Sequence, residues 1–333
     1  MSQALIELGL FASKSLILVL FILIVFVAFF ALLAKGKDKT KGKLAIKNLN
    51  QKMAETKEEM LAEILPKPLF KKFLKEKKAS EKEKAKSDKK IKSLFVLNFM
   101  GDIKASAVST LREEITTILN IAESGDEVLL KLESGGGVVH GYGLAAAQLM
   151  RLRDKRIPLT IAIDKVAASG GYMMACVGNK VLSAPFAIIG SIGVIVQLPN
   201  FHRVLKNKHI DFEQHTAGEY KRTITVFGEN TEAGREKLQE EIEDIHEQFK
   251  HLISQYRTSI DINKVATGEH WLGNQALPLG LVDEIKTSDE FILNRAKEFN
   301  VFEISYELKK PLLAKLTGAA GQLRDSVLQM FLR

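Results

Sequence analysis

The sequence predicts an α/β domain of layered architecture with parallel strands, and two observations support this class. Short apolar runs alternate with amphipathic helical segments from Ser93 onward, an order typical of a parallel sheet covered by helices. Two glycine-rich segments follow predicted strands and open predicted helices: the first glycine turn (residues 134–137) and the second glycine turn (residues 167–171). Strand ends of this kind are where α/β folds place their functional sites.

The spacing of apolar residues assigns the individual elements. Strands are predicted at residues 94–99, 128–132 and 159–163, and helices at residues 108–122, 145–152 and 229–259. In the first of these helices, Leu111 and Ile115 lie on one helical face. The apolar stretch 181–198 is interrupted by Pro185 and Gly190, so we expect buried strands and turns there instead of a membrane helix.

An uncharged apolar run covers residues 15–34. At about 1.5 Å per residue, a helix of this length crosses a hydrocarbon core of roughly 30 Å, so the run is predicted to be an uncleaved anchor in the lipid bilayer. The alternative is a cleaved signal peptide, which has a shorter apolar core, whereas the lysines from Lys35 to Lys43 resemble a stop-transfer flank. This flank favours a cytoplasmic body, and the side of the membrane stays open.

Basic residues are concentrated after the anchor. Residues 35–92 hold 20 lysines and 9 acidic residues, whereas residues 93–333 hold 27 basic and 30 acidic residues. The net charge of +8 therefore belongs to a linker, and without a nucleic-acid-binding motif the sequence predicts no nucleic-acid partner. We expect a solvated or disordered tether; the alternative is a basic segment lying on anionic lipid head groups.

The chain is thereby divided into four parts. These are an anchor at residues 1–34, a Lys-rich helical or disordered linker at 35–92, a folded domain at 93–290 and a C-terminal extension at 291–333. The residues after the linker are sufficient for one hydrophobic core. A single cysteine, Cys176, excludes an internal disulfide framework.

The first glycine turn reads Ser134-Gly135-Gly136-Gly137 and can present backbone N–H groups to an anion. It lacks the G-K-[ST] ending of a Walker loop and the spacing of a dinucleotide-binding loop. An oxyanion hole stays open as its role, beside the simpler explanation that a tight turn needs glycine for positive φ.

Ser169 in the second glycine turn is the candidate nucleophile. Its neighbours are small (A-A-S-G-G), which leaves the hydroxyl uncrowded at a strand-to-helix turn. The amide of Gly170 could then point at a carbonyl that the serine attacks. The same local sequence is also typical of a packing or capping serine.

A nucleophilic serine needs a base, and the residues leave several candidates open. None of the seven histidines stands in a context that singles it out, although His140 follows the first glycine turn. Lys165 lies four residues before the serine, and Lys221 lies far downstream in T-A-G-E-Y-K-R-T. A lysine acts as a base only where burial or a nearby cation lowers its pKa.

Five motifs occur together in one order along the chain. They are S-G-G-G-V-V-H-G-Y-G, D-K-V-A-A-S-G-G-Y-M-M-A, A-P-F-A-I-I-G-S-I-G-V, T-A-G-E-Y-K-R-T and G-E-H-W-L-G-N-Q-A-L-P-L-G-L-V-D-E-I. In this order they resemble the signal peptide peptidase (SppA) family of bacterial serine peptidases, most closely its SohB branch. The likeness spans essentially the whole chain and is strongest from about residue 93 to 290.

The resemblance implies a ClpP/crotonase-like fold and a membrane-anchored serine endopeptidase with a Ser–Lys dyad. Carried over by position, the nucleophile falls on Ser169 and the general base on Lys221, while Lys165 is unused. The oxyanion hole falls on the backbone amides of Gly136 and Gly170. No metal or organic cofactor is implied.

Partners and location follow from the same resemblance. Relatives with one catalytic unit assemble into rings that bring serine and lysine together across a subunit boundary, so a homo-oligomer in the bacterial inner membrane is implied, attached by a single span. The implied substrates are hydrophobic peptides, such as signal-peptide remnants, or misfolded envelope proteins. One departure stands out: the family usually has S-P-G-G, and Gly135 in place of the proline is expected to loosen the turn.

Three alternatives remain. The chain could be a catalytically inactive membrane scaffold or adaptor on the same fold. A Ser-His-Asp peptidase needs a histidine about 25 residues after the serine, where Val194 stands, and the nearest histidine is His202. A CoA-binding crotonase-type enzyme would share the fold without the Ser-Gly-Gly turn.

Overall fold

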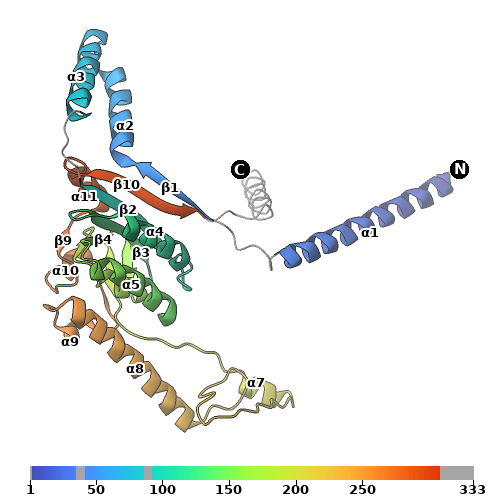
Figure 1. The fold of residues 1–333 in the computed structure, drawn as a ribbon. Coiled ribbons are helices and arrows are strands. Elements are labelled where there is room, and N and C mark those ends of the chain that lie inside the picture. Colours follow the sequence, from blue (N-terminus) through green and yellow to red (C-terminus); the bar gives the residue numbers. More distant parts are fainter. Residues whose placement is uncertain (1, 35–41, 86–91, 308–333) are drawn as a thin grey trace. The chain divides into compact units, whose positions relative to one another are not determined.

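The computed structural model describes residues 2–34, 42–85 and 92–307, which belong to two compact units. One unit contains helix α1 (Ser2–Ala34). The other, residues 44–306, is the folded body (Figure 1). No helix within the described residues combines the length and the apolarity that a membrane crossing requires. The membrane anchor at residues 15–34 is therefore not confirmed.

The body is built on a ten-stranded sheet whose main path runs β1-β10-β2-β3-β4-β6-β9. β5 pairs with the end of β3 and with β7, and β7 pairs with β8. Among the pairings with a described register, only β7–β8 is antiparallel. The strands are β1 (Lys43–Asn48), β2 (Ser93–Gly101), β3 (Glu127–Ser134), β4 (Leu159–Ile163), β5 (Val166–Ala168), β6 (Lys180–Ser183), β7 (Ile188–Gly190), β8 (His270–Leu272), β9 (Glu284–Ile285) and β10 (Asn300–Glu307).

Helices pack on both faces of the sheet because the strands are apolar on both sides. Phe95 and Leu97 of β2 belong to a core with α4, α5 and α6, whereas their neighbours Leu94 and Val96 belong to a second core with α11. The helices of the body are α2 (Leu49–Ile64), α3 (Lys67–Ala85), α4 (Val108–Ile121), α5 (Val139–Asp154), α6 (Gly170–Ala175), α7 (His202–Asn207), α8 (Glu232–Tyr256), α9 (Ile262–Val265), α10 (Gly273–Ala276) and α11 (Ser288–Arg295). The predicted α/β class is confirmed.

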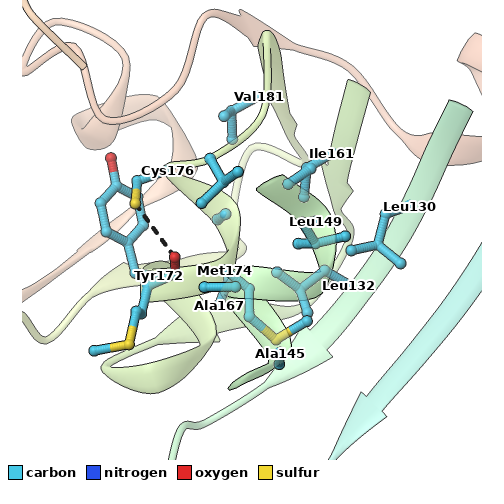
Figure 2. Close-up of a cluster of buried hydrophobic side chains, with 14 of the residues drawn as sticks. Leu130, Leu132, Ala145, Leu149, Ile161, Ala167, Tyr172, Met174, Cys176 and Val181 are labelled. Carbon is cyan, nitrogen blue, oxygen red and sulfur yellow. Dashed lines mark hydrogen bonds between the residues drawn. The ribbon is translucent and has the colours of Figure 1, made fainter. Parts of the chain in front are cut away.

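The larger core lies between the sheet and the pair α5–α6. Leu130 of β3 and Ile161 of β4 gather with Leu149 of α5 and Met174 of α6 (Figure 2), and all four side chains are fully buried. Burial of an aliphatic side chain of this size contributes about 1.5–3 kcal/mol. This core fixes the carboxyl ends of β3 and β5, from which both glycine turns emerge.

The sheet extends beyond residues 93–290, the range predicted for the folded domain. β10 lies between β1 and β2, so both flanks of that range contribute strands. The side chain of Asn50 fastens α2 to the same region, since its amide donates to the carbonyls of Ala296 and Phe299 at 3.0 Å and accepts from the Val301 amide at 2.6 Å. Pairings of this kind explain why part of a Lys-rich segment belongs to the body.

Residues 194–231 form a segment, here called the arm, that extends away from the sheet (Figure 1). The prediction of buried strands in residues 181–198 holds for β6 and β7. It is wrong for the end of that stretch, where Ile195 is 75% exposed and Val196 is also exposed. The arm carries the short helix α7 and leads into α8.

One buried carboxyl group connects α4 to the end of β10. Glu114 is 5% exposed, and its carboxylate accepts a hydrogen bond of 2.8 Å from the backbone amide of Tyr306. Burial raises the pKa of Glu114 from 4.5 to about 7. The folded protein therefore holds this proton more tightly than the unfolded chain does.

We expect Glu114→Gln to change how stability depends on pH. The protonated carboxyl contributes stability that is fully present below about pH 4.5 and is lost as the pH rises through about 7. Glutamine keeps a neutral acceptor for the Tyr306 amide and has no proton to lose, so its contribution to stability does not fall as the pH rises. The melting temperature of the variant relative to the wild type should therefore rise from about pH 5 to about pH 8. The half-exposed neighbour Glu113 provides the control, and a pH-independent difference for Glu114→Gln would contradict the assignment.

Candidate active site

The sheet places the two glycine turns side by side. Ser134, the last residue of β3, pairs in parallel register with Ala167 of β5. The chain then leaves β3 through the first glycine turn and leaves β5 through Ser169 into α6. Both turns lie at the carboxyl ends of parallel strands, which is the edge where α/β folds bind and react with ligands.

The backbones of the two turns are in direct contact. A Cβ atom added to Gly136 would lie 2.7 Å from the amide nitrogen of Gly170 and 2.8 Å from Cβ of Ser169, which is closer than real side chains approach. Gly136 also has a φ of +88°, a conformation that favours glycine. The site therefore requires glycine at position 136 for space and for conformation, and these are the turns that the sequence singled out.

Ser169 is held in an unusual backbone conformation. It has φ 53° and ψ −121°, a combination that non-glycine residues rarely adopt. Its amide donates to the carbonyl of Gly190 at 2.7 Å, and its carbonyl accepts from the Met173 amide at 3.0 Å. Strain of this kind costs of order 1–3 kcal/mol and is concentrated at functional sites. A sharp strand-to-helix turn of this kind is also what presents a nucleophilic serine in other hydrolases.

The thiol of Cys176 is not a rival nucleophile. It is fully buried in the core, and its Sγ donates to the carbonyl of Met173 at 3.3 Å (Figure 2). Burial raises the pKa of this thiol to about 12, so the reactive thiolate is absent near neutral pH. The half-buried Ser169 is left as the candidate nucleophile at this edge of the sheet.

The candidate bases lie apart from the serine in the single chain. Lys165 is 70% exposed and forms an ion pair of 3.0 Å with Glu133. Lys221 is exposed on the arm, and His140 is exposed in the first turn of α5. Within the described residues, no lysine or histidine forms a hydrogen bond with Ser169. The structure therefore brings the serine and the two glycines together, and it does not bring Lys221 to them.

The two candidate oxyanion amides have different surroundings. Gly170 is the first residue of α6, and amides of a first helical turn have no partner within their own helix. The amide of Gly136 donates to Oγ of Ser134 at 3.0 Å. A donor that already has one acceptor can share its hydrogen between two acceptors. Among the described hydrogen bonds the Gly170 amide has no acceptor, whereas the Gly136 amide is held by the serine at the start of its turn.

The sequence did not single out Tyr142 or the hydroxyl group of Ser134. Tyr142 is fully buried, and a Cβ atom on Gly170 would clash with its ring. Its hydroxyl lies 2.6 Å from Oγ of Ser134. The available signal was G-Y-G at residues 141–143, three residues after the first glycine turn, where a bulky side chain stands between glycines at the start of a helix.

Comparisons with known proteins connect the chain to one family of peptidases. The profile described as "Peptidase family S49 N-terminal" matches residues 3–149, and the profile "Peptidase family S49" matches residues 151–301. The chain is 56% identical over 244 residues to a protein of Haemophilus influenzae named "Probable protease SohB", covering 73% of this chain and 69% of that one. A protein of the same name from Buchnera aphidicola subsp. Schizaphis graminum is 48% identical over 316 residues, covering 93% and 92%.

A solved structure of lower similarity was also found. It is the 1510-N membrane-bound stomatin-specific protease, as a mutant in complex with a substrate peptide. It shares 13% sequence identity with this chain at a TM-score of 0.43, and the match covers 69% of this chain and 98% of that one.

The strained conformation at position 169 predicts an unusual order of stabilities. Glycine adopts positive φ without the penalty that a Cβ brings, so Ser169→Gly should be more stable than Ser169→Ala by about 1 kcal/mol, measured by denaturant unfolding. Ser254, exposed within α8, is the matched control, because glycine should there be less stable than alanine by about 1 kcal/mol. If glycine were less stable than alanine at both positions, position 169 would be unstrained.

Proposed function

The chain belongs to peptidase family S49 and is a protease, and from this premise we propose that it is a serine endopeptidase that uses Ser169 and Lys221 as a Ser–Lys dyad. The observation that carries the proposal is the strained conformation of Ser169 against the backbone of Gly136. Strain that the surrounding structure maintains at an exposed edge of the sheet is typical of a functional position. The ClpP/crotonase-like fold implied by the family resemblance belongs to the same proposal.

The proposed reaction is acyl transfer to the serine followed by hydrolysis. Neutral Lys221 accepts the proton of the Ser169 hydroxyl as its oxygen attacks a peptide carbonyl. The amides of Gly170 and Gly136 stabilise the tetrahedral oxyanion, and one such donor is worth roughly 3–4 kcal/mol. The lysine then protonates the leaving amine, and water releases the acyl group from the serine.

The dyad requires an assembled protein. Lys221 is exposed in the single chain, whereas a lysine base needs a desolvated environment or a nearby cation. The arm that carries it also exposes large apolar side chains, among them Ile195, Val204 and Phe212. Contiguous exposed apolar surface marks interaction sites. A second copy covering the arm would bury the lysine, and we propose a homo-oligomeric ring in which Ser169 and Lys221 of neighbouring subunits meet.

We also propose attachment to the bacterial inner membrane through residues 15–34. Apolar side chains along α1, including Leu16, Phe21 and Ile24, are exposed, and exposed apolar helices of this kind bury their side chains in lipid or protein. A protease at the membrane would meet hydrophobic peptides such as signal-peptide remnants and misfolded envelope proteins, which are the proposed substrates.

The dyad is tested by three variants of the full chain in detergent, assayed on an apolar peptide. Ser169→Ala and Lys221→Ala should each lower kcat by at least about 1,000-fold, because each removes a participant in bond making. Lys165→Ala should keep most of the activity, since its ion pair with Glu133 is a surface pair. If Lys221→Ala kept full activity, Lys221 would not be the general base. An inactive wild type would favour the scaffold alternative.

A mixing experiment completes this test. Dissociated and reassembled subunits of Ser169→Ala and Lys221→Ala should regain about a quarter of the wild-type activity if each site uses serine and lysine of different subunits. If the reassembled mixture recovered no activity, the serine and the lysine of one site would belong to one subunit.

Deletion of residues 2–34 tests the membrane attachment. The full chain should stay in the membrane pellet after extraction with alkaline carbonate, because an inserted apolar helix is not released by loss of charge contacts. The shortened chain should move to the supernatant. Equal partitioning of the two proteins would rule out an anchor in this segment.

A further inference from the structure

We propose that Tyr142 is the positioning residue that orients the Gly136 amide for catalysis, acting through the hydroxyl group of Ser134. The inference rests on the proposed function, since it concerns the oxyanion hole of the same site. Tyr142 is fully buried and its hydroxyl pairs with Ser134 and Asp102, so it is assigned a positioning role. Its ring and its hydroxyl contact different parts of the site.

A one-way chain of hydrogen bonds runs from the first glycine turn to the loop after β2. Tyr142 donates its hydroxyl hydrogen to the carbonyl of Asp102 at 2.8 Å. Ser134 must then donate its own hydrogen to the Tyr142 oxygen, across 2.6 Å. The amide of Gly136 donates to Oγ of Ser134 at 3.0 Å. Each hydroxyl donates once and accepts once, so the chain fixes the direction of the Gly136 N–H.

The two hydroxyl groups of this chain are buried, and its last acceptor, Asp102, lies in a hydrogen-bonded turn. Ser134 is 2% exposed and Tyr142 is fully buried. Burial raises the pKa of Tyr142, which keeps its phenol protonated as a donor. The Asp102 carbonyl also accepts from the Ala105 amide at 2.9 Å, and a carboxylate oxygen of Asp102 accepts from the Ser106 amide at 2.7 Å. Opening the bond between the two buried hydroxyl groups would leave polar groups unsatisfied, so the network resists rearrangement.

The same tyrosine also packs against Gly170, the residue that carries the second proposed oxyanion amide. Its ring lies so close to Gly170 that any side chain at that position would clash with it. Gly101 is packed as tightly against Oγ of Ser134 and the hydroxyl of Tyr142. One side chain therefore contacts the backbone at Gly170 and holds the turn of Gly136, the two residues assigned to the oxyanion hole.

This arrangement explains how the turn keeps its shape without proline. Three consecutive glycines impose almost no backbone restriction, and fixing them costs more conformational entropy than fixing other residues. An added Cβ atom on Gly135 meets no heavy atom within 4 Å, so side-chain packing does not restrain it. The hydrogen bonds of Ser134 and Tyr142 add a restraint to the close packing of Gly136, and a donor oriented before the reaction needs no reorganisation during it.

The test uses Tyr142→Phe and Ser134→Ala in the full chain, with Tyr172→Phe as the matched control. Tyr172 is a second fully buried tyrosine, and its hydroxyl donates to the carbonyl of Leu281 at 2.9 Å, away from the glycine turns. We expect each test variant to lower kcat about tenfold with KM nearly unchanged, because the donor is misoriented and not removed. The double variant should lose no more than the larger single loss, since both changes break one chain.

Amide hydrogen exchange provides a readout that does not depend on catalysis. In the Ser169→Ala background, exchange of the Gly136 amide should be about fivefold faster with Tyr142→Phe and unchanged with Tyr172→Phe. Equal kcat values for Tyr142→Phe and Tyr172→Phe, or an unchanged Gly136 amide, would overturn the positioning role. Full activity of Ser169→Ala would instead overturn the proposed function, and the exchange result would still decide the structural claim.

Discussion

The candidate site depends on one constraint, the direct contact between the backbones of the two glycine turns. Because β5 pairs with the end of β3, Ser169 and Gly136 leave the sheet beside each other with no room for a side chain between them. Ser169 has its strained conformation at this contact, and the Gly170 amide lies at the same point. The core of β3, β4, α5 and α6 maintains the contact, so packing energy far from the serine keeps the strain in place.

Much of this could be predicted from the sequence because it is local. Apolar runs identified β2, β3 and β4, and the two glycine turns stood at predicted strand ends. The pairing of β10 between β1 and β2 could not be predicted in this way. Its strands are separated by some 200 residues of sequence, and the contacts that place them, such as those of Asn50, are made by side chains with no local pattern.

The candidate site likewise combines features that follow from local sequence with features that depend on residues distant in sequence. Ser169 and its glycines follow from local sequence, whereas the direction of the Gly136 amide depends on a hydrogen bond to Ser134 and on a tyrosine from the next helix. A sequence pattern shows which residues are small, but it does not show to which acceptor a backbone amide donates its hydrogen bond. The lysine is more distant still. Lys221 is exposed on the arm, so the role proposed for it would depend on contacts with a second subunit.

In the proposed mechanism, the oxyanion hole and the general base therefore depend on different features. The oxyanion hole depends on packing within one chain, and the base depends on the association of subunits. The proposed oxyanion donors lie within one chain, close to Tyr142 and to its hydrogen bond with Asp102. The proposed base, Lys221, lies on the arm, where apolar side chains such as Ile195 are exposed. Under this proposal, half of the machinery is preorganised within each chain and the other half depends on association. Peptide hydrolysis would then require the assembled protein, because Ser169 and Lys221 would meet only across a subunit boundary.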